Sequence, residues 1–249
     1  MADRRAVLLI SHGSRQPHGA EFAHSVANAL RREGPGSAVA VGFLELDRPS
    51  PSHALRQLVG SGYDQIQVVP LLFSAGHHYR VDLPAALDAV RESHRWIQVD
   101  TAAPLLTETE TDLVAALDAR LSQTLPEGTG LSGIPDGLVL LAAGSSDPGA
   151  RAQVRELGQA WGRRHGLPAE VAFCDLRGRE VRSAIALLQA GGARQVACGS
   201  LFLAAGRLLD AGQRVALDAG AQAVAGPLGT TPVLLDLIRR RCLAPVAAG

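Results

Sequence analysis

The sequence predicts an α/β protein of two similar lobes, each a small parallel sheet flanked by helices. Three apolar, strand-like segments of the first half recur about 130 residues later. They are AVLLISHGS (6–14) with GLVLLAAGS (137–145), VAVGFLEL (39–46) with AEVAFCDL (169–176), and VVPLLFSAG (68–76) with CGSLFLAAG (198–206). Agreement across three separate segments indicates an internal duplication.

Segments with helical spacing lie between these strand-like runs. In 22–30, 83–90 and 113–121, apolar residues recur every three or four positions. Asp82 stands near the N-cap of the second of these helices, and Pro84 stands in its first turn. Short buried strands that alternate with amphipathic helices favour parallel sheets covered on both faces.

A Gly- and Pro-rich segment, LPEGTGLSGIPDG at 125–137, separates the two copies. We therefore expect a first lobe at 1–125, a linker at 126–136 and a second lobe at 137–249. Each lobe then has the size of a typical single domain.

Composition limits the classes of function. The 249 residues are 47% hydrophobic and 19% charged, which is typical of a globular chain, and the formal net charge is zero. A neutral chain has no overall field to attract nucleic acid or an anionic membrane. Its longest apolar runs fall short of the roughly 20 residues of a membrane span, and the N-terminal run is too short for a signal peptide. We expect a cytoplasmic protein.

Two residue types narrow the chemistry further. The sequence contains no Lys, which excludes Schiff-base chemistry and the phosphate-binding Lys of a P-loop. The three cysteines lack CxxC spacing, and two of them, Cys174 and Cys198, lie in apolar runs. We interpret these thiols as buried and structural.

Polar groups that could carry chemistry follow the first three strands. His12 follows the first strand, Glu45 ends the second, and His77 and His78 follow the third. Ligands of open α/β sheets bind beyond the carboxyl ends of the strands, so these groups could converge at one edge. The second copy keeps the scaffold but lacks the imidazoles, which favours chemistry in the first lobe alone. The corresponding residues are Ala143, Asp175, Arg207 and Leu208.

His12, His78 and Glu45 are our candidates for catalysis and metal binding. Two imidazoles and a carboxylate can bind a first-row divalent metal, and they can also move protons near neutral pH. Which of the three is a ligand and which is a base stays open. A structural metal site usually has four protein ligands. A set of three ligands is better suited to a metal ion that is transferred to another molecule.

Three arginines lie just beyond these groups and suggest an anionic substrate. Guanidinium groups match carboxylates well, and their joint placement favours a polyanion. We expect substrate binding by five residues: Arg15, Arg48, Arg80, Ser14 and His77.

At this point the sequence resembles a known family. LLISHGSR, FLELDRPS and VVPLLFSAGHHYRVDLP are similar to the three signature segments of the sirohydrochlorin chelatase family, the CbiX and SirB type of class II chelatases. The family pattern Gly-x-His-x-x-x-Asp-x-Pro maps onto Gly76, His78, Asp82 and Pro84. The resemblance covers 5–125, and 137–242 resembles a degenerate second copy, as in long, fused family members.

The resemblance implies a function and its partners. Such enzymes insert a divalent metal into sirohydrochlorin, a tetrapyrrole with eight carboxylates, in siroheme biosynthesis and without ATP. It implies that His12 and His78 hold the metal while Glu45 relays protons. It further implies one active site, no permanently bound cofactor, the metal as a substrate, and a monomer that forms an internal pseudo-dimer.

The metal itself and the activity leave alternatives. Iron is favoured because the sequence lacks the His-rich tail of some cobalt-associated relatives, but cobalt, for a cobalamin pathway, or nickel would use the same residues. A carrier of metal or tetrapyrrole without catalysis would also show the same binding residues. A histidine phosphatase is disfavoured because Ser11 stands where an Arg-His-Gly motif has its arginine.

Overall fold

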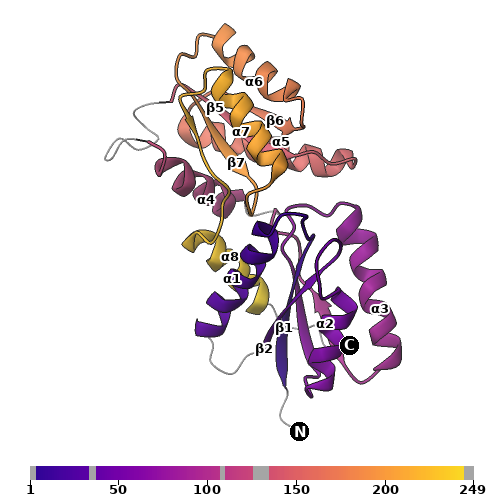
Figure 1. The fold of residues 1–249 in the computed structure, drawn as a ribbon. Helices are drawn as coiled ribbons and strands as arrows, with labels where there is room; N and C mark the ends of the chain where they lie inside the picture. Colours follow the sequence, from indigo (N-terminus) through magenta and orange to yellow (C-terminus); the bar gives the residue numbers. More distant parts are fainter. Residues whose placement is uncertain (1–3, 34–37, 107–109, 126–134, 244–249) are drawn as a thin grey trace. The chain divides into compact units, whose positions relative to one another are not determined.

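The computed structural model describes residues 4–33, 38–106, 110–125 and 135–243, and it contains two four-stranded parallel sheets (Figure 1). The chain forms two compact units, Met1–Thr107 with Leu235–Gly249, and Glu108–Leu234. The predicted fold class, two similar α/β lobes each with a small parallel sheet, is therefore confirmed.

The sheet of the first unit has the strand order β2-β1-β3-β4. Its strands are β1 (Arg5–Ser11), β2 (Ala38–Phe43), β3 (Gln65–Pro70) and β4 (Gln98–Thr101). The helices of this part of the chain are α1 (His18–Glu33), α2 (Pro51–Gly60), a one-turn π-helix η1 (His78–Asp82) and α3 (Leu83–Ser93). Because β1 and β3 are central neighbours, the loops that follow them lie side by side.

Both faces of this sheet are buried, as a parallel sheet requires. Side chains of β1 alternate between the faces, and those of Ala6, Leu8 and Ile10 pack in one cluster with α2 and α3. These two helices lie next to each other in the first unit (Figure 1). Val7 and Leu9 are buried on the opposite face, where α1 contacts β1.

The second unit repeats this arrangement with the strand order β6-β5-β7-β8. Its strands are β5 (Gly137–Ala143), β6 (Ala169–Cys174), β7 (Val196–Leu201) and β8 (Ala223–Val224). Helices α5 (Pro148–His165), α6 (Arg179–Ala190) and α7 (Arg207–Asp218) connect them. The registers also correspond, since Ser11 pairs with Phe43 in one sheet and Ala142 with Phe173 in the other.

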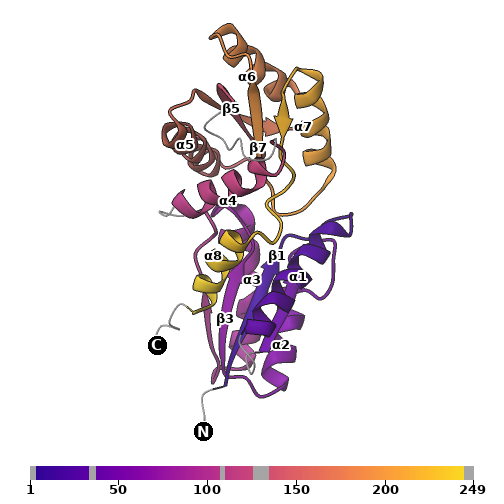
Figure 2. The ribbon, with the colours of Figure 1, turned by 90° about the vertical axis from the view of Figure 1, so that its left-hand side faces the viewer.

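Two helices do not belong to the unit that the sequence order predicts. Helix α4 (Glu110–Ser122) follows β4 of the first sheet, yet it contacts β7 and α5 in the second unit (Figure 2). Most of α8 (Pro232–Leu243), which follows the second sheet, belongs to the first unit, where the Arg5 guanidinium donates to the Cys242 carbonyl at 2.8 Å. By its contacts, α4 buries its apolar stripe on the second sheet. The expected lobes at 1–125 and 137–249 with a linker at 126–136 describe the repeat in the sequence and stay a prediction.

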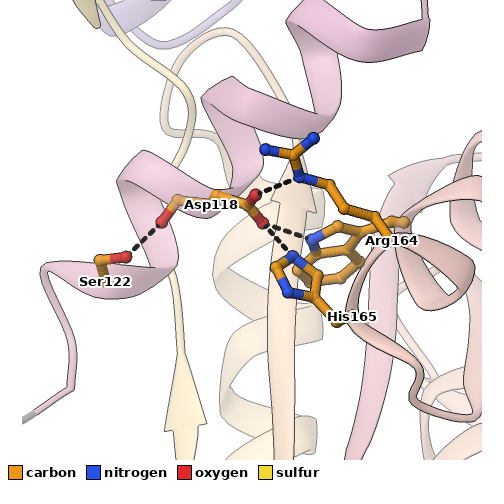
Figure 3. Close-up of polar contacts among 5 residues, drawn as sticks. Asp118, Ser122, Arg164 and His165 are labelled. Carbon is orange, nitrogen blue, oxygen red and sulfur yellow. Dashed lines mark hydrogen bonds and ion pairs between the residues drawn. The ribbon is translucent and has the colours of Figure 1, made fainter. Parts of the chain in front are cut away.

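A polar cluster fixes α4 to α5 inside the second unit (Figure 3). The Asp118 carboxylate accepts the Trp161 indole N–H at 2.8 Å and contacts His165 Nε2 at 2.8 Å and Arg164 Nε at 3.3 Å. Trp161 is fully buried, so its N–H needs this acceptor.

Cys174, Cys198 and Cys242 are free and buried, as predicted for structural thiols. Burial raises the pKa of each thiol to about 12, which keeps the nucleophilic thiolate form rare. Within the described residues, no helix combines the length and the apolar character that crossing a membrane requires.

Candidate active site

The candidate site is built where β1 and β2 of the first unit end. Their pairing continues past the strands, because the backbone N–H of Leu44 donates to Ser11 O at 3.0 Å and that of Glu45 donates to His12 O at 2.9 Å. Gly13 follows with a φ of +93°, and a Cβ at this position would overlap the carbonyl oxygen of Glu45. The glycine at position 13 is therefore required by the close approach of the two loops.

The imidazoles of His12 and His78 meet at this edge. Their Nε2 atoms are 2.9 Å apart, and the ring planes cross at 82° with centroids 4.3 Å apart. The two residues are 66 positions apart in sequence and come from the loops after β1 and β3. The predicted convergence of these two histidines is thus present in the structure.

Each imidazole has a second partner on its other nitrogen. Nδ1 of His12 lies 3.2 Å from the carbonyl oxygen of Gly13, and Nδ1 of His78 lies 2.6 Å from Oδ2 of Asp82. A carboxylate accepts hydrogen bonds, so Nδ1 of His78 donates to Asp82. One proton lies between the two Nε2 atoms, and the tautomers of the two rings decide which nitrogen donates it.

This geometry suits a metal ion in place of the shared proton. Two nitrogens bound to a metal at about 2.1 Å and a right angle to each other lie about 3.0 Å apart. The observed separation of 2.9 Å is close to that value. To exchange the proton for a divalent ion, both rings would turn, because a hydrogen bond aligns the two nitrogen lone pairs along the Nε2–Nε2 line whereas a shared metal needs them to converge on one point beside it.

His77 differs from its neighbour. Its Nε2 is 3.6 Å from Asp82 Oδ1, and 67% of its side chain is exposed, against 34% for His78. His77 therefore lies at the rim of the site, and its predicted contact with a substrate stays a prediction.

Glu45, the third member of the predicted triad, is placed differently. Its backbone is bonded to His12, but the residue is exposed. Among the described residues, no group of three or more His, Cys, Asp or Glu side chains is arranged to hold a metal ion. The structure brings two of the three together, and metal binding by the complete set stays a prediction.

The residues expected to bind substrate lie on the same three loops. Arg15, Arg48 and Arg80 are exposed, and Arg80 belongs to η1. Ser14 is half-buried, and its hydroxyl accepts the backbone N–H of Gln16 at 3.0 Å, which serves the turn before α1. Binding of an anion by these residues stays a prediction.

Sequence reasoning did not assign the contacts of two residues that support the site. Asp82 precedes α3 as expected, but it makes no side-chain cap, because its carboxylate bonds His78 instead. Tyr79 donates its hydroxyl to the carbonyl of Ala102 at 3.3 Å and so ties η1 to the loop after β4. Burial raises the Tyr79 pKa, with a smaller opposing effect from Arg241. The sequence pattern carried a signal for Asp82, namely its spacing of four residues from His78.

The corresponding edge of the second unit holds different groups. Asp175, the counterpart of Glu45, accepts the backbone N–H groups of Arg177 and Gly178 and closes a turn. Leu208 takes the place of His78 and is 39% exposed. In the described part of this unit, the scaffold is thus repeated without the imidazole pair.

The fold and the candidate site together define the class of this protein. It is a duplicated α/β protein with a histidine pair at the carboxyl ends of the strands of one sheet. The sequence model of the CbiX family matches residues 6–124 and again 137–244. The chain belongs to the CbiX family, in a form with two copies, as the sequence resemblance predicted.

The curated relatives align with a stretch of this chain about as long as one of its two copies. The sirohydrochlorin cobaltochelatase of Sulfurisphaera tokodaii is 40% identical over 85 residues, which are 34% of this chain and 69% of that protein. That of Saccharolobus solfataricus is 39% identical over 105 residues, covering 40% of this chain and 80% of that protein.

Solved structures match both units of the fold. SirB from Bacillus subtilis with Fe³⁺ has a TM-score of 0.78 at 20% identity, over 98% of this chain and 96% of that one. The sirohydrochlorin chelatase SirB from Bacillus subtilis subspecies spizizenii in complex with cobalt has a TM-score of 0.76 at 18% identity, over 96% and 94%. At such identities the likeness shows the shared fold.

Proposed function

We propose that this protein inserts a divalent metal ion into sirohydrochlorin. The observation that carries the proposal is the His12–His78 pair, whose Nε2 atoms lie 2.9 Å apart at the carboxyl edge of the first sheet. The family membership supports it, since the curated relatives described above are sirohydrochlorin cobaltochelatases.

In this mechanism the two imidazoles deliver the metal. The ion binds both Nε2 atoms in place of their shared proton and then passes to the ring nitrogens of the tetrapyrrole. Insertion removes two pyrrole protons. As the metal leaves, the Nε2 atoms can take up one proton and restore their hydrogen bond, while Glu45, exposed to solvent beside His12, accepts or relays the other. No step consumes ATP.

Substrate binding relies on the exposed arginines of the same loops. Arg15, Arg48 and Arg80 can pair with carboxylates of the macrocycle and hold its plane over the histidine pair. Such contacts hold the reacting nitrogens and the metal at short distance, which favours transfer.

We propose that both Fe²⁺ and Co²⁺ are accepted. Iron is the expectation from the sequence, whereas the curated relatives are named for cobalt. Two imidazole nitrogens suit either ion, and affinity alone does not select between neighbouring first-row metals. Nickel, which the same ligands suit, is the third ion to compare.

The test is anaerobic incubation of the purified protein with sirohydrochlorin and each metal, followed by the absorption spectrum of the tetrapyrrole. We expect acceleration over the uncatalysed rate, and loss of about 100-fold or more in His12→Ala and His78→Ala. Leu208→Ala, the matched change in the second unit, should keep the wild-type rate.

Two results would contradict the proposal. Binding of metal and tetrapyrrole without acceleration by any of the three ions would identify a carrier. A rate in His12→Ala equal to that of the wild type would remove the histidine pair from the reaction.

A further inference from the structure

The carboxylate of Asp82 contacts two consecutive histidines. Its Oδ2 is 2.6 Å from Nδ1 of His78, four residues earlier, and its Oδ1 is 3.6 Å from Nε2 of His77, five residues earlier. In an α-helix, side chains that meet across a turn are three or four residues apart. The contact with His78 has this spacing, and the additional contact with His77, five residues away, is favoured by a wider turn.

The π-helix η1 supplies that turn. The backbone N–H of Leu83 donates to the carbonyl of His78, the i to i+5 bond that defines a π-helix. With this wider turn, residues four and five positions before Asp82 both face its side chain. Single π turns of this kind inside α-helices are frequent at functional sites.

The bond to Asp82 also determines which nitrogen of His78 is presented to the site. A carboxylate accepts but does not donate, so Nδ1 of His78 carries a proton directed at Oδ2. Nε2, directed at His12, is then the nitrogen whose lone pair can bind a metal. With the proton on Nε2 alone, that lone pair would be absent.

The second copy lacks the counterparts of the π turn, of Asp82 and of the two histidines in its described residues. There α7 begins as an α-helix at Arg207, directly after Gly206, with no π turn among the described residues of that loop. Gly212 stands at the offset that corresponds to Asp82, and any Cβ there would overlap the sulfur of Cys174. The carboxylate and the π turn therefore occur together with the imidazole pair.

We propose that Asp82 is a positioning residue, which through the π turn holds His78 in the Nδ1–H form and directs its Nε2 toward the incoming metal. The proposal rests on the proposed function for the metal, but the state of His78 exists without metal. Hydrogen-bond partners of metal-binding histidines act in this way in other proteins, and their loss typically lowers metal affinity roughly 10- to 100-fold.

The first experiment compares Asp82→Asn with Asp88→Asn in the full-length protein. Asp88 lies on α3, is exposed, and pairs with Arg91 rather than with a histidine. Asparagine keeps the shape of Asp82 but removes its charge, so Nδ1 of His78 meets either a neutral amide oxygen, which is a weaker acceptor than a carboxylate, or an NH₂ donor, which requires the proton to be on Nε2. In a Co²⁺ titration followed by visible absorption, we expect about 10- to 100-fold weaker binding for Asp82→Asn and wild-type binding for Asp88→Asn.

The second experiment examines the metal-free wild-type protein by ¹⁵N NMR of its imidazoles. We expect Nδ1 of His78 to carry a proton, and its signal to change in Asp82→Asn but not in Asp88→Asn. This measurement needs neither metal nor substrate. Its wild-type result does not depend on whether the variants fold.

The outcomes separate the two proposals. An unprotonated Nδ1 of His78 in the wild type, or equal Co²⁺ affinity of wild type and Asp82→Asn, would overturn the role of Asp82. Protonated Nδ1 with Co²⁺ binding that is insensitive to His12→Ala and His78→Ala would leave the orientation of His78 supported and overturn the metal role of the pair.

Discussion

Replacement of Gly13 by alanine should disturb the site and the first unit together. At φ +93°, a residue with a Cβ costs roughly 1–2 kcal/mol in conformational energy. The new Cβ would also overlap the carbonyl oxygen of Glu45, so one of the two loops must move. That movement breaks the hydrogen bond from Glu45 N–H to His12 O, which contributes roughly 0.5–1.5 kcal/mol to the free energy of unfolding.

These contributions give about 1.5–3.5 kcal/mol of destabilisation, together with displacement of His12. Gly192→Ala is the matched control, because Gly192 has a φ of +102° and a Cβ added there would meet, among the described residues other than its chain neighbours, nothing within 4 Å. It should show only the conformational cost of roughly 1–2 kcal/mol.

The assay is urea unfolding followed by far-UV circular dichroism, combined with Co²⁺ titration. The two units can unfold separately, and Trp96 of the first unit also fluoresces, so the fluorescence of the buried Trp161 is recorded in a Trp96→Phe background to identify the transition of the second unit. If Gly13→Ala were no more destabilising than Gly192→Ala and bound Co²⁺ as the wild type does, the close approach of the two loops would not support the site.

Two further changes test contacts in the second unit. Asp118→Ala leaves the indole N–H of buried Trp161 without its acceptor and should cost about 1–3 kcal/mol, measured as a lower urea midpoint of the tryptophan transition; an unchanged midpoint would contradict a role of this cluster in holding α4. Backbone hydrogen bonds from Arg194 and Gln195 lower the pKa of the Asp136 carboxyl, so its stabilising effect is present above the unfolded-state pKa and is lost as pH falls through the folded-state pKa. Asp136→Asn should therefore lower the urea midpoint at neutral pH and make no difference in strong acid; a difference that persisted there would contradict this origin.

Much of the fold could be predicted because it is encoded locally. Strand-like runs and helical spacing mark the elements, and their repetition after about 130 residues marks the duplication. The exchange of α4 and α8 could not be predicted. An apolar stripe such as that of Leu113 and Leu117 requires a sheet to cover, but it does not specify which of two similar sheets.

The site shows the same limit. The convergence of His12 and His78 is predictable because parallel strands place their carboxyl ends at one edge. The spacing of Asp82 fits an N-cap equally well, since nothing in the five residues of η1 distinguishes a π turn from an α turn before their contacts are known. The exposure of Glu45 likewise depends on a loop whose path is set by long-range contacts with His12 and Gly13.

The exchange of helices determines the order in which the units can be completed during synthesis. The second unit is one continuous stretch, Glu108–Leu234, and all its residues are available before the first unit has received α8. Domains usually form in order from the N-terminus as the chain is made. Here the synthesis of the histidine-bearing unit begins first but is completed second. The whole second copy is translated before α8 becomes available to complete the core of the first unit. Separating the copies at 126–136 would give neither unit its own full set of helices.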